Sequence, residues 1–414
     1  MRRLFLSLLA SLVLTSSAAL AGTYSLTGNQ RWIALASRQS LDEAIGIARA
    51  FVWRMQGVRV MQASNGWYAV VVGPHEGTDI RGARDKLAAS GAVPKDILLS
   101  NGNGYVAEVW TKKEPELQLN LEYEGDEKSI VQNFADLRLT LSRQALKEGD
   151  GYNPTLSATR AGKEIINLQI EDVGRDEPSS ELWALRLDPD SPTAQLVFTA
   201  FTGGAHCCTD TKFITQVGND WRVIDGELLD GGGYWFEDID GDGVYEIISL
   251  DNSFHYAYAS YAESRAPQRI STLRNGQLQD VTSDPKFTSW LRQNIVALEY
   301  QASMDADLWR SNGFLAAWVA YKASVGELDQ AWAKMMVSYN SSSDWPLIEC
   351  MAEREKNGSC PVGKEITLSF PSALRKHLQR AGYIDAPAVP SPAAQAPVLK
   401  ISPAAPSSAF SVPP

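Results

Sequence analysis

Hydrophobic residues follow two different periods between residues 30 and 110. Apolar positions alternate in four short runs, which predicts strands, and recur every three to four residues in two longer runs, which predicts helices. Ser40 followed by Glu43 forms a capping box, and Asn65-Gly66 tolerates the positive φ of a tight hairpin. We therefore expect a small α/β sandwich with both helices on one face of a four-stranded sheet. The expected elements are strands at 32–36, 58–61, 66–72 and 104–110 and helices at 40–56 and 79–91.

The rest of the chain changes character twice. Short apolar runs broken by Gly, Asp and Asn predict a mainly β region over 137–282. From 287 to 383, apolar residues such as Trp290 and Ile295 recur at helical spacing, which predicts packed amphipathic helices. In the β region, the alternating aromatics at 254, 256 and 258 predict one buried face of a strand, with His255 on the opposite face.

Both ends of the chain resemble segments outside folded domains. Arg2 and Arg3 precede an apolar run at 4–14, and Ala19-Leu20-Ala21 forms a small-x-small cleavage site. We expect a cleaved signal peptide at 1–21 and a periplasmic protein, with an uncleaved anchor as the alternative. Residues 385–414 contain eight Pro and eight Ala, a composition that buries no core, which predicts a disordered tail.

Charge is distributed unevenly along the chain. Residues 22–110 carry nine Lys and Arg against seven Asp and Glu, whereas 111–384 carry 26 against 41. The formal net charge of −11 argues against nucleic acid as a partner, because phosphate is not attracted to an acidic surface. After the signal peptide, no run reaches the roughly 18 apolar residues of a membrane-spanning helix.

The N-terminal region resembles a known family. The residues that carry the resemblance are NGWYAVVVGP at 65–74, preceded by WIALAS at 32–37 and the helix at 42–50. They are similar to the SPOR domain, whose members bind peptidoglycan glycan strands on the open face of the sheet. The resemblance covers about 80 residues and implies a βαββαβ fold.

The resemblance also implies a glycan site, with Trp67 as the stacking platform and Ser37, Arg38 and Tyr105 at its edges. By strand alternation, Ala69 and Val71 share the outward face with Trp67. The family places polar or basic side chains there, so an apolar face also suits protein docking or a contact with another domain.

A metal site is predicted in the acidic zone. Asp238-Ile239-Asp240-Gly241-Asp242-Gly243-Val244-Tyr245-Glu246, called the acidic loop below, places carboxylates at positions 1, 3, 5 and 9 with a glycine at 6. A hard cation prefers such oxygen ligands, so we expect structural calcium held by Asp238, Asp240, Asp242, the Val244 carbonyl and Glu246. The loop resembles those of FG-GAP and VCBS-type β modules; an acidic hairpin without an ion is the alternative.

The four cysteines predict two disulfides in an exported protein. Three pairings are possible. We favour Cys350 with Cys360, because a short clasp would stabilise the charged loop between them by roughly 3 kcal/mol. This pairing leaves Cys207 with Cys208, beside His206.

We therefore expect an α+β multidomain protein: signal peptide 1–21, SPOR-like sandwich 22–112, mainly β module with a calcium loop 113–285, helical segment with the cysteine clasp 286–384, and disordered tail 385–414. The expected function is non-enzymatic: binding of peptidoglycan glycan strands, or of an envelope protein, in the periplasm. The alternative is an envelope hydrolase that uses an acid from 238–242 or His206. Neither a G-x-S-x-G elbow nor an H-E-x-x-H helix is present, so no catalytic residue is assigned.

Overall fold

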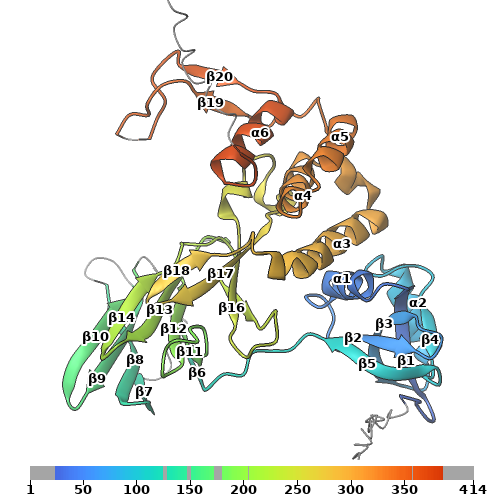
Figure 1. Cartoon of the computed structure of the whole chain (residues 1–414), viewed down its shortest axis with the longest axis horizontal. Helices are drawn as coiled ribbons and strands as arrows, with labels where there is room; N and C mark the ends of the chain where they lie inside the picture. Colours follow the sequence, from blue (N-terminus) through green and yellow to red (C-terminus); the bar gives the residue numbers. More distant parts are fainter. Residues whose placement is uncertain are drawn as a thin grey trace, which may run out of the picture.

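A computed structural model of the chain describes residues 24–124, 128–146, 151–171, 180–203, 205–356 and 358–385. The described residues form a mixed α+β structure with three parts: a small N-terminal unit, a larger region of β-sheets, and a mainly helical C-terminal segment (Figure 1). The expected signal peptide and, apart from Asp385, the expected tail lie outside them. Within the described ranges, no helix is both long and apolar enough to span a membrane.

The N-terminal unit is an antiparallel sheet in the order β4-β1-β3-β2-β5 with two helices packed on one face. Ser40 caps α1 by accepting the amide hydrogen of Glu43, and Asp79 caps α2 through Gly82. The short strand β4 was not predicted. The elements are β1 (Gln30–Arg38), α1 (Leu41–Phe51), β2 (Val58–Ala63), β3 (Tyr68–Glu76), α2 (Ile80–Ala89), β4 (Leu98–Ser100) and β5 (Tyr105–Thr111).

The second face of this sheet is covered, although the SPOR resemblance implied an open face. Ala69 and Val71 alternate away from α1 as predicted, but they are only 6% and 0% exposed. Tyr24 and Leu26, from the segment before β1, pack against this face, and the indole Nε1 of Trp32 donates to the Tyr24 carbonyl at 3.2 Å. The apolar residues on this face are therefore buried by the chain itself.

The β region begins with two sheets that enclose one hydrophobic core. Their strand orders are β10-β9-β8-β7 and β14-β13-β12-β11-β6, all antiparallel. Leucines from both sheets meet between them, among them Leu139, Leu156 and Leu196, which are 0% exposed. The strands are β6 (Leu119–Tyr123), β7 (Ser129–Phe134), β8 (Leu137–Ala145), β9 (Tyr152–Arg160), β10 (Lys163–Gln169), β11 (Ser180–Leu185), β12 (Gln195–Phe201), β13 (Thr209–Val217) and β14 (Asp220–Asp225).

A third sheet, β15-β16-β17-β18, lies between this sandwich and the helices. Successive residues of a strand point to opposite faces. Ile247 accordingly packs towards the sandwich and Ile248 towards α3, and both are almost fully buried. The strands are β15 (Trp235–Glu237), β16 (Glu246–Leu250), β17 (Gln268–Arg274) and β18 (Gln277–Asp280).

The segment between β16 and β17 differs from its prediction. It forms two short 3-10 helices, η1 (Asn252–Phe254) and η2 (Tyr261–Glu263), where a strand was expected. Phe254 and Tyr258 are buried as predicted, but Tyr256 is 45% exposed. Aromatic alternation therefore identified two core residues while giving the wrong backbone.

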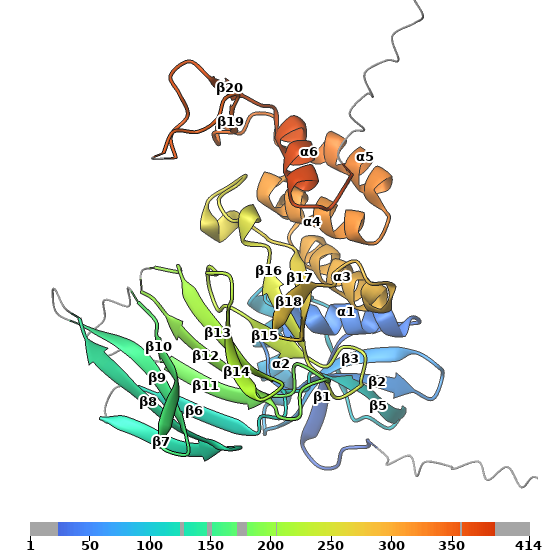
Figure 2. The same cartoon turned by 60° about the vertical axis from the view of Figure 1, so that its left-hand side comes forward.

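The C-terminal segment packs against both preceding parts through α3, which lies over α1 in Figures 1 and 2. The rings of Phe51 and Tyr300 meet edge to face, with centroids 5.8 Å apart. A two-stranded hairpin interrupts the helices. The elements are η3 (Pro285–Phe287), α3 (Thr288–Met304), η4 (Ala306–Arg310), α4 (Asn312–Ser324), α5 (Leu328–Ser338), β19 (Ile348–Cys350), β20 (Glu365–Thr367) and α6 (Phe370–Arg380).

Candidate functional site

A large groove lies where the N-terminal unit meets the third sheet and α3. Its volume is about 1120 Å³, and α1, β5, the segment 112–118, β15, the acidic loop and α3 contribute to its walls. We call it the aromatic groove, because five of its lining residues are tryptophans: Trp53, Trp110, Trp183, Trp235 and Trp290.

These tryptophans differ in how much of the ring faces solvent. Trp53 is 64% exposed and meets Trp235 edge to face at 6.1 Å between centroids, and the ammonium of Lys112 lies 4.6 Å from its ring. Trp110, like Trp235, is partly exposed. Trp290 is only 4% exposed, and its indole nitrogen has no hydrogen-bond partner among the described residues. The groove thus offers several apolar ring surfaces, while the unpaired indole nitrogen of Trp290 is buried behind them.

Charged side chains fix the base of the groove. The guanidinium of Arg49 binds both carboxylate oxygens of Glu237, at 2.5 and 3.1 Å, and its Nε donates to Gln293 at 3.1 Å. Arg49 also lies 5.7 Å from the ring of Trp110 and 5.2 Å from that of Trp290. This side chain therefore connects residues from three distant segments of the chain.

The close packing of α1 against α3 depends on a glycine. A Cβ atom on Gly46 would lie 2.5 Å from the Cβ of Val296 and 2.7 Å from the carbonyl oxygen of Gln293. No ordinary side chain fits at these distances. Gly46 thus allows the backbones of the two helices to approach and brings Arg49 within reach of Gln293.

The acidic loop connects β15 to β16 and forms one edge of the groove. Carboxylate oxygens of Asp238, Asp240 and Glu246 lie within 4.8 Å of one another. Asp238 also accepts the amide hydrogens of Gly241 and Gly243, at 2.9 and 3.2 Å, which holds the turn in place.

Two features of the loop were not visible in the sequence. The carboxylate of Asp242 is outside the group of three and accepts the amide hydrogen of Val244 at 2.8 Å. The ammonium of Lys286 lies 2.7 Å from Asp240 and 3.8 Å from Glu246. A cation bound by these carboxylates would have to compete with this lysine.

Glu246 is the most deeply buried acid of the loop, with 3% of its surface exposed. Its Oε2 accepts the amide hydrogen of Ile239 at 2.9 Å. Burial disfavours the charged form and raises the pKa of Glu246 to about 7, although the hydrogen bond acts in the opposite direction. A nearby cation would favour the carboxylate.

The glycan-binding residues expected from the SPOR resemblance gather at one end of the N-terminal sheet. Arg38 pairs with Tyr68, directly after Trp67, and Tyr105 pairs with Ala63, whose amide donates to the Trp67 carbonyl. Ser37 precedes Arg38 in β1. Trp67 is 40% exposed, whereas burial raises the pKa of the Tyr105 hydroxyl. This group lies outside the aromatic groove.

The cysteines form the favoured pairs, Cys350 with Cys360 and Cys207 with Cys208. The second pair belongs to a polar cluster that the sequence did not predict. His206 and His255 both approach Asp230, at 3.4 and 3.8 Å. The sequence marks the segment 203–210 as unusual. It does not indicate that His255 lies close to His206, because the two residues are about 50 positions apart in the chain.

Comparison with known proteins shows relatives over most of the chain. Residues 287–382 match the family described as the sll0997 C-terminal domain. The chain is 35% identical over 295 residues to the probable thylakoid lumen protein sll0997 of Synechocystis, which covers 70% of this chain and 83% of that protein. It is 40% identical over 385 residues to the uncharacterized protein y4bJ of Sinorhizobium fredii, covering 92% of this chain but only 60% of that protein. No solved structure matches.

Proposed function

The chain belongs to the family of the protein sll0997, and we propose that it is an exported protein of the cell envelope that binds peptidoglycan glycan strands in the aromatic groove. The Synechocystis relative is named a probable thylakoid lumen protein, which is an exported compartment. This name and the signal-like residues 1–21 support export, and for this chain we propose the periplasm.

The observation that carries the proposal is the gathering of tryptophans and charged side chains in one groove. An indole ring presents a flat apolar face to the C–H face of a sugar, and its N–H remains free to donate. Charged and amide side chains such as Arg49, Glu237 and Gln293 supply hydrogen-bonding groups for hydroxyls at the base of the groove. The volume of about 1120 Å³ lies slightly above the usual range of small-molecule pockets, which favours an oligosaccharide over a single sugar.

The groove replaces the open sheet face as the proposed glycan site. Tyr24 and Leu26 cover the apolar face on which SPOR-type binding was expected. Trp67 is still exposed at the sheet end and offers a competing platform. Co-sedimentation of variants distinguishes binding in the groove from binding at Trp67.

Glycan binding can be measured by co-sedimentation of the mature chain with purified cell-wall sacculi. We expect Trp53→Ala to weaken binding about tenfold, since losing one stacking platform removes roughly 1 to 1.5 kcal/mol. Trp53 is an exposed residue, so its truncation leaves the core intact. Trp67→Ala is the matched control and should bind as the wild type does.

Two results would contradict the groove. If Trp67→Ala loses binding while Trp53→Ala keeps it, the ligand lies on the end of the sheet. If the well-folded wild-type chain does not co-sediment with sacculi, the proposed glycan function is wrong, and a protein ligand for the groove becomes the better hypothesis.

We further propose that calcium stiffens the acidic loop at the edge of this groove. Asp238, Asp240 and Glu246 present oxygens at mutual distances that suit a hard cation. Calcium should raise the melting temperature by mass action. Asp240→Asn should abolish the rise, whereas Lys286→Met should strengthen calcium binding because the competing ammonium is gone.

Differential scanning fluorimetry and calorimetric titration after EDTA treatment measure both effects, with magnesium as the control ion. An unchanged melting temperature and no binding heat in both the wild type and Lys286→Met would leave the loop as an acidic turn.

A further inference from the structure

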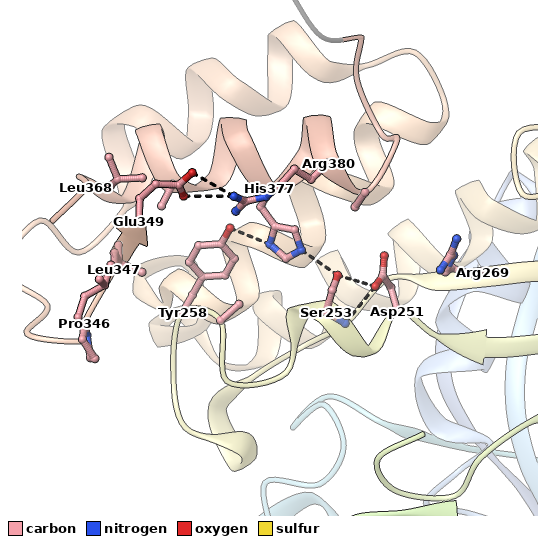
Figure 3. A pocket seen from close by; sticks show the side chains of 14 residues that line it. Asp251, Ser253, Tyr258, Arg269, Pro346, Leu347, Glu349, Leu368, His377 and Arg380 are labelled. Carbon is pink, nitrogen blue, oxygen red and sulfur yellow. Dashed lines mark hydrogen bonds and ion pairs between the residues drawn. The ribbon is translucent and has the colours of Figure 1, made fainter. Parts of the chain in front are cut away.

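A second cavity, separate from the aromatic groove, lies between the segment 251–258 and the C-terminal hairpin and helix (Figure 3). Its volume is about 550 Å³, within the range of small-molecule sites. We call it the serine pocket, because the exposed residue Ser253 lies in its wall. Neither the glycan nor the calcium proposal uses it.

Ser253 is part of a continuous chain of hydrogen bonds, drawn in Figure 3. Its Oγ donates its hydrogen to Oδ1 of Asp251 at 2.6 Å and lies 2.8 Å from Nε2 of His377. The other ring nitrogen, Nδ1 of His377, lies 2.9 Å from the hydroxyl of Tyr258. Asp251, Tyr258 and His377 are 4%, 5% and 8% exposed, so an accessible hydroxyl is backed by three buried partners.

This arrangement goes beyond a structural cap. Asp251 caps η1 by accepting the amide hydrogen of Ser253 at 3.1 Å, which does not require the serine hydroxyl. Its second oxygen accepts the hydroxyl hydrogen of Tyr383 at 3.0 Å. The carboxylate therefore keeps two partners if the serine proton moves to His377.

His377 has the properties of a general base. Burial lowers its pKa, so the imidazole is neutral near pH 7. A hydroxyl within reach of a base whose other nitrogen is held by a third group is the general signature of an activated nucleophile.

We propose that Ser253 is a nucleophile and His377 its general base, in a site that hydrolyses carboxylic esters with small apolar acyl groups. Tyr258 acts as a positioning residue that orients the imidazole. Apolar side chains line much of the cavity and suit an acyl chain: Ala257, Pro346, Leu347, Ile348, Leu368 and Ala373.

The reaction is balanced with water as the second reactant. The hydroxyl hydrogen of Ser253 first turns from Asp251 to an unprotonated Nε2 of His377, whose ring hydrogen is then on Nδ1 and is donated to the hydroxyl oxygen of Tyr258. Oγ of Ser253 attacks the carbonyl carbon while its proton passes to Nε2 of His377. The bond to the alcohol then breaks, and the alcohol leaves with that proton. Water, deprotonated by the same nitrogen, attacks the acyl-serine and releases the carboxylic acid, which returns Ser253 and His377 to their starting state. The guanidinium of Arg269, on the cavity wall, pairs with Asp280 at 2.9 Å, and its positive charge would favour an oxyanion formed beside it.

The test uses the mature chain with a fluorophosphonate probe, whose fluoride the serine displaces, and with p-nitrophenyl acetate and butyrate. We expect the probe to label Ser253, as located by peptide mass spectrometry. Ser253→Ala should lose the label and, like His377→Asn, reduce ester hydrolysis on the order of a hundredfold or more. Tyr258→Phe should lower kcat about tenfold and leave KM unchanged, a split that a purely structural role would not produce.

Ser260→Ala, two residues after Tyr258 and outside the pocket, is the control and should behave like the wild type. Melting temperatures of all variants report on folding, and the labelling of the wild-type chain does not depend on them. The proposal is overturned if the probe leaves Ser253 of the folded wild type unlabelled, or if a folded Ser253→Ala hydrolyses the esters at the wild-type rate.

Discussion

Replacing Gly46 by alanine is expected to lower the free energy of unfolding by about 2 kcal/mol, within the usual range for overpacking. In an isolated helix the same change would stabilise, because alanine exceeds glycine in helix propensity by about 1 kcal/mol. Here the new Cβ would lie 2.5 Å from the Cβ of Val296 and 2.7 Å from the carbonyl of Gln293. Since backbone atoms are involved, the helices must separate, and the packing term outweighs the propensity.

Urea denaturation of the two proteins measures this difference. Gly77→Ala is the matched control, because a Cβ there meets nothing within 4 Å. Separation of α1 from α3 should also displace Arg49 and weaken co-sedimentation with sacculi. Equal or higher stability of Gly46→Ala would mean that α1 does not pack closely against α3 in solution.

The stability of the ion-free protein is expected to fall by about 3 kcal/mol between pH 4.5 and pH 7 through Glu246 alone. The folded protein keeps this proton up to about pH 7, whereas the unfolded chain releases it near pH 4.5. Folding therefore binds a proton in this window, and stability decreases as the pH rises. This is opposite in sign to the usual behaviour of a surface carboxylate in an ion pair.

The contribution of Glu246 is obtained by comparing the wild type with Glu246→Gln across this pH range, in EDTA. The glutamine keeps an acceptor for the Ile239 amide and does not titrate, so the two curves should diverge towards pH 7 in favour of the variant. Glu365→Gln, at an exposed strand position, should follow the wild type. Parallel curves for the wild type and Glu246→Gln would show that Glu246 titrates normally.

Local signals in the sequence predicted local structure well. Ser40 and Asp79 cap the two predicted N-terminal helices, and Gly66 has the positive φ expected of the hairpin turn. In the acidic loop, the spacing alone identified Asp238, Asp240 and Glu246 as neighbours. In each case the residues that determine the geometry lie within nine positions of one another. Their spacing in the sequence is therefore sufficient to predict the local structure.

Contacts between distant segments could not be predicted in this way. The alternation of apolar residues in β3 does not indicate that Tyr24 and Leu26 cover one face of the sheet. Ser253 and His377 are 124 positions apart, and no local motif connects them. The predicted strand at 254–258 also placed neighbouring residues on opposite faces, which concealed the serine pocket.

Helix α3 contributes to three hydrophobic cores, each of which includes residues of the preceding parts of the chain. Ile295 packs with the third sheet, while Val296 and Tyr300 pack with α1 and Phe51. The family match begins at residue 287, but this residue is therefore not the start of a unit that folds independently. A fragment that starts there would lose the residues that pack against these two faces of α3. We therefore expect the C-terminal segment to fold cooperatively only together with the preceding parts.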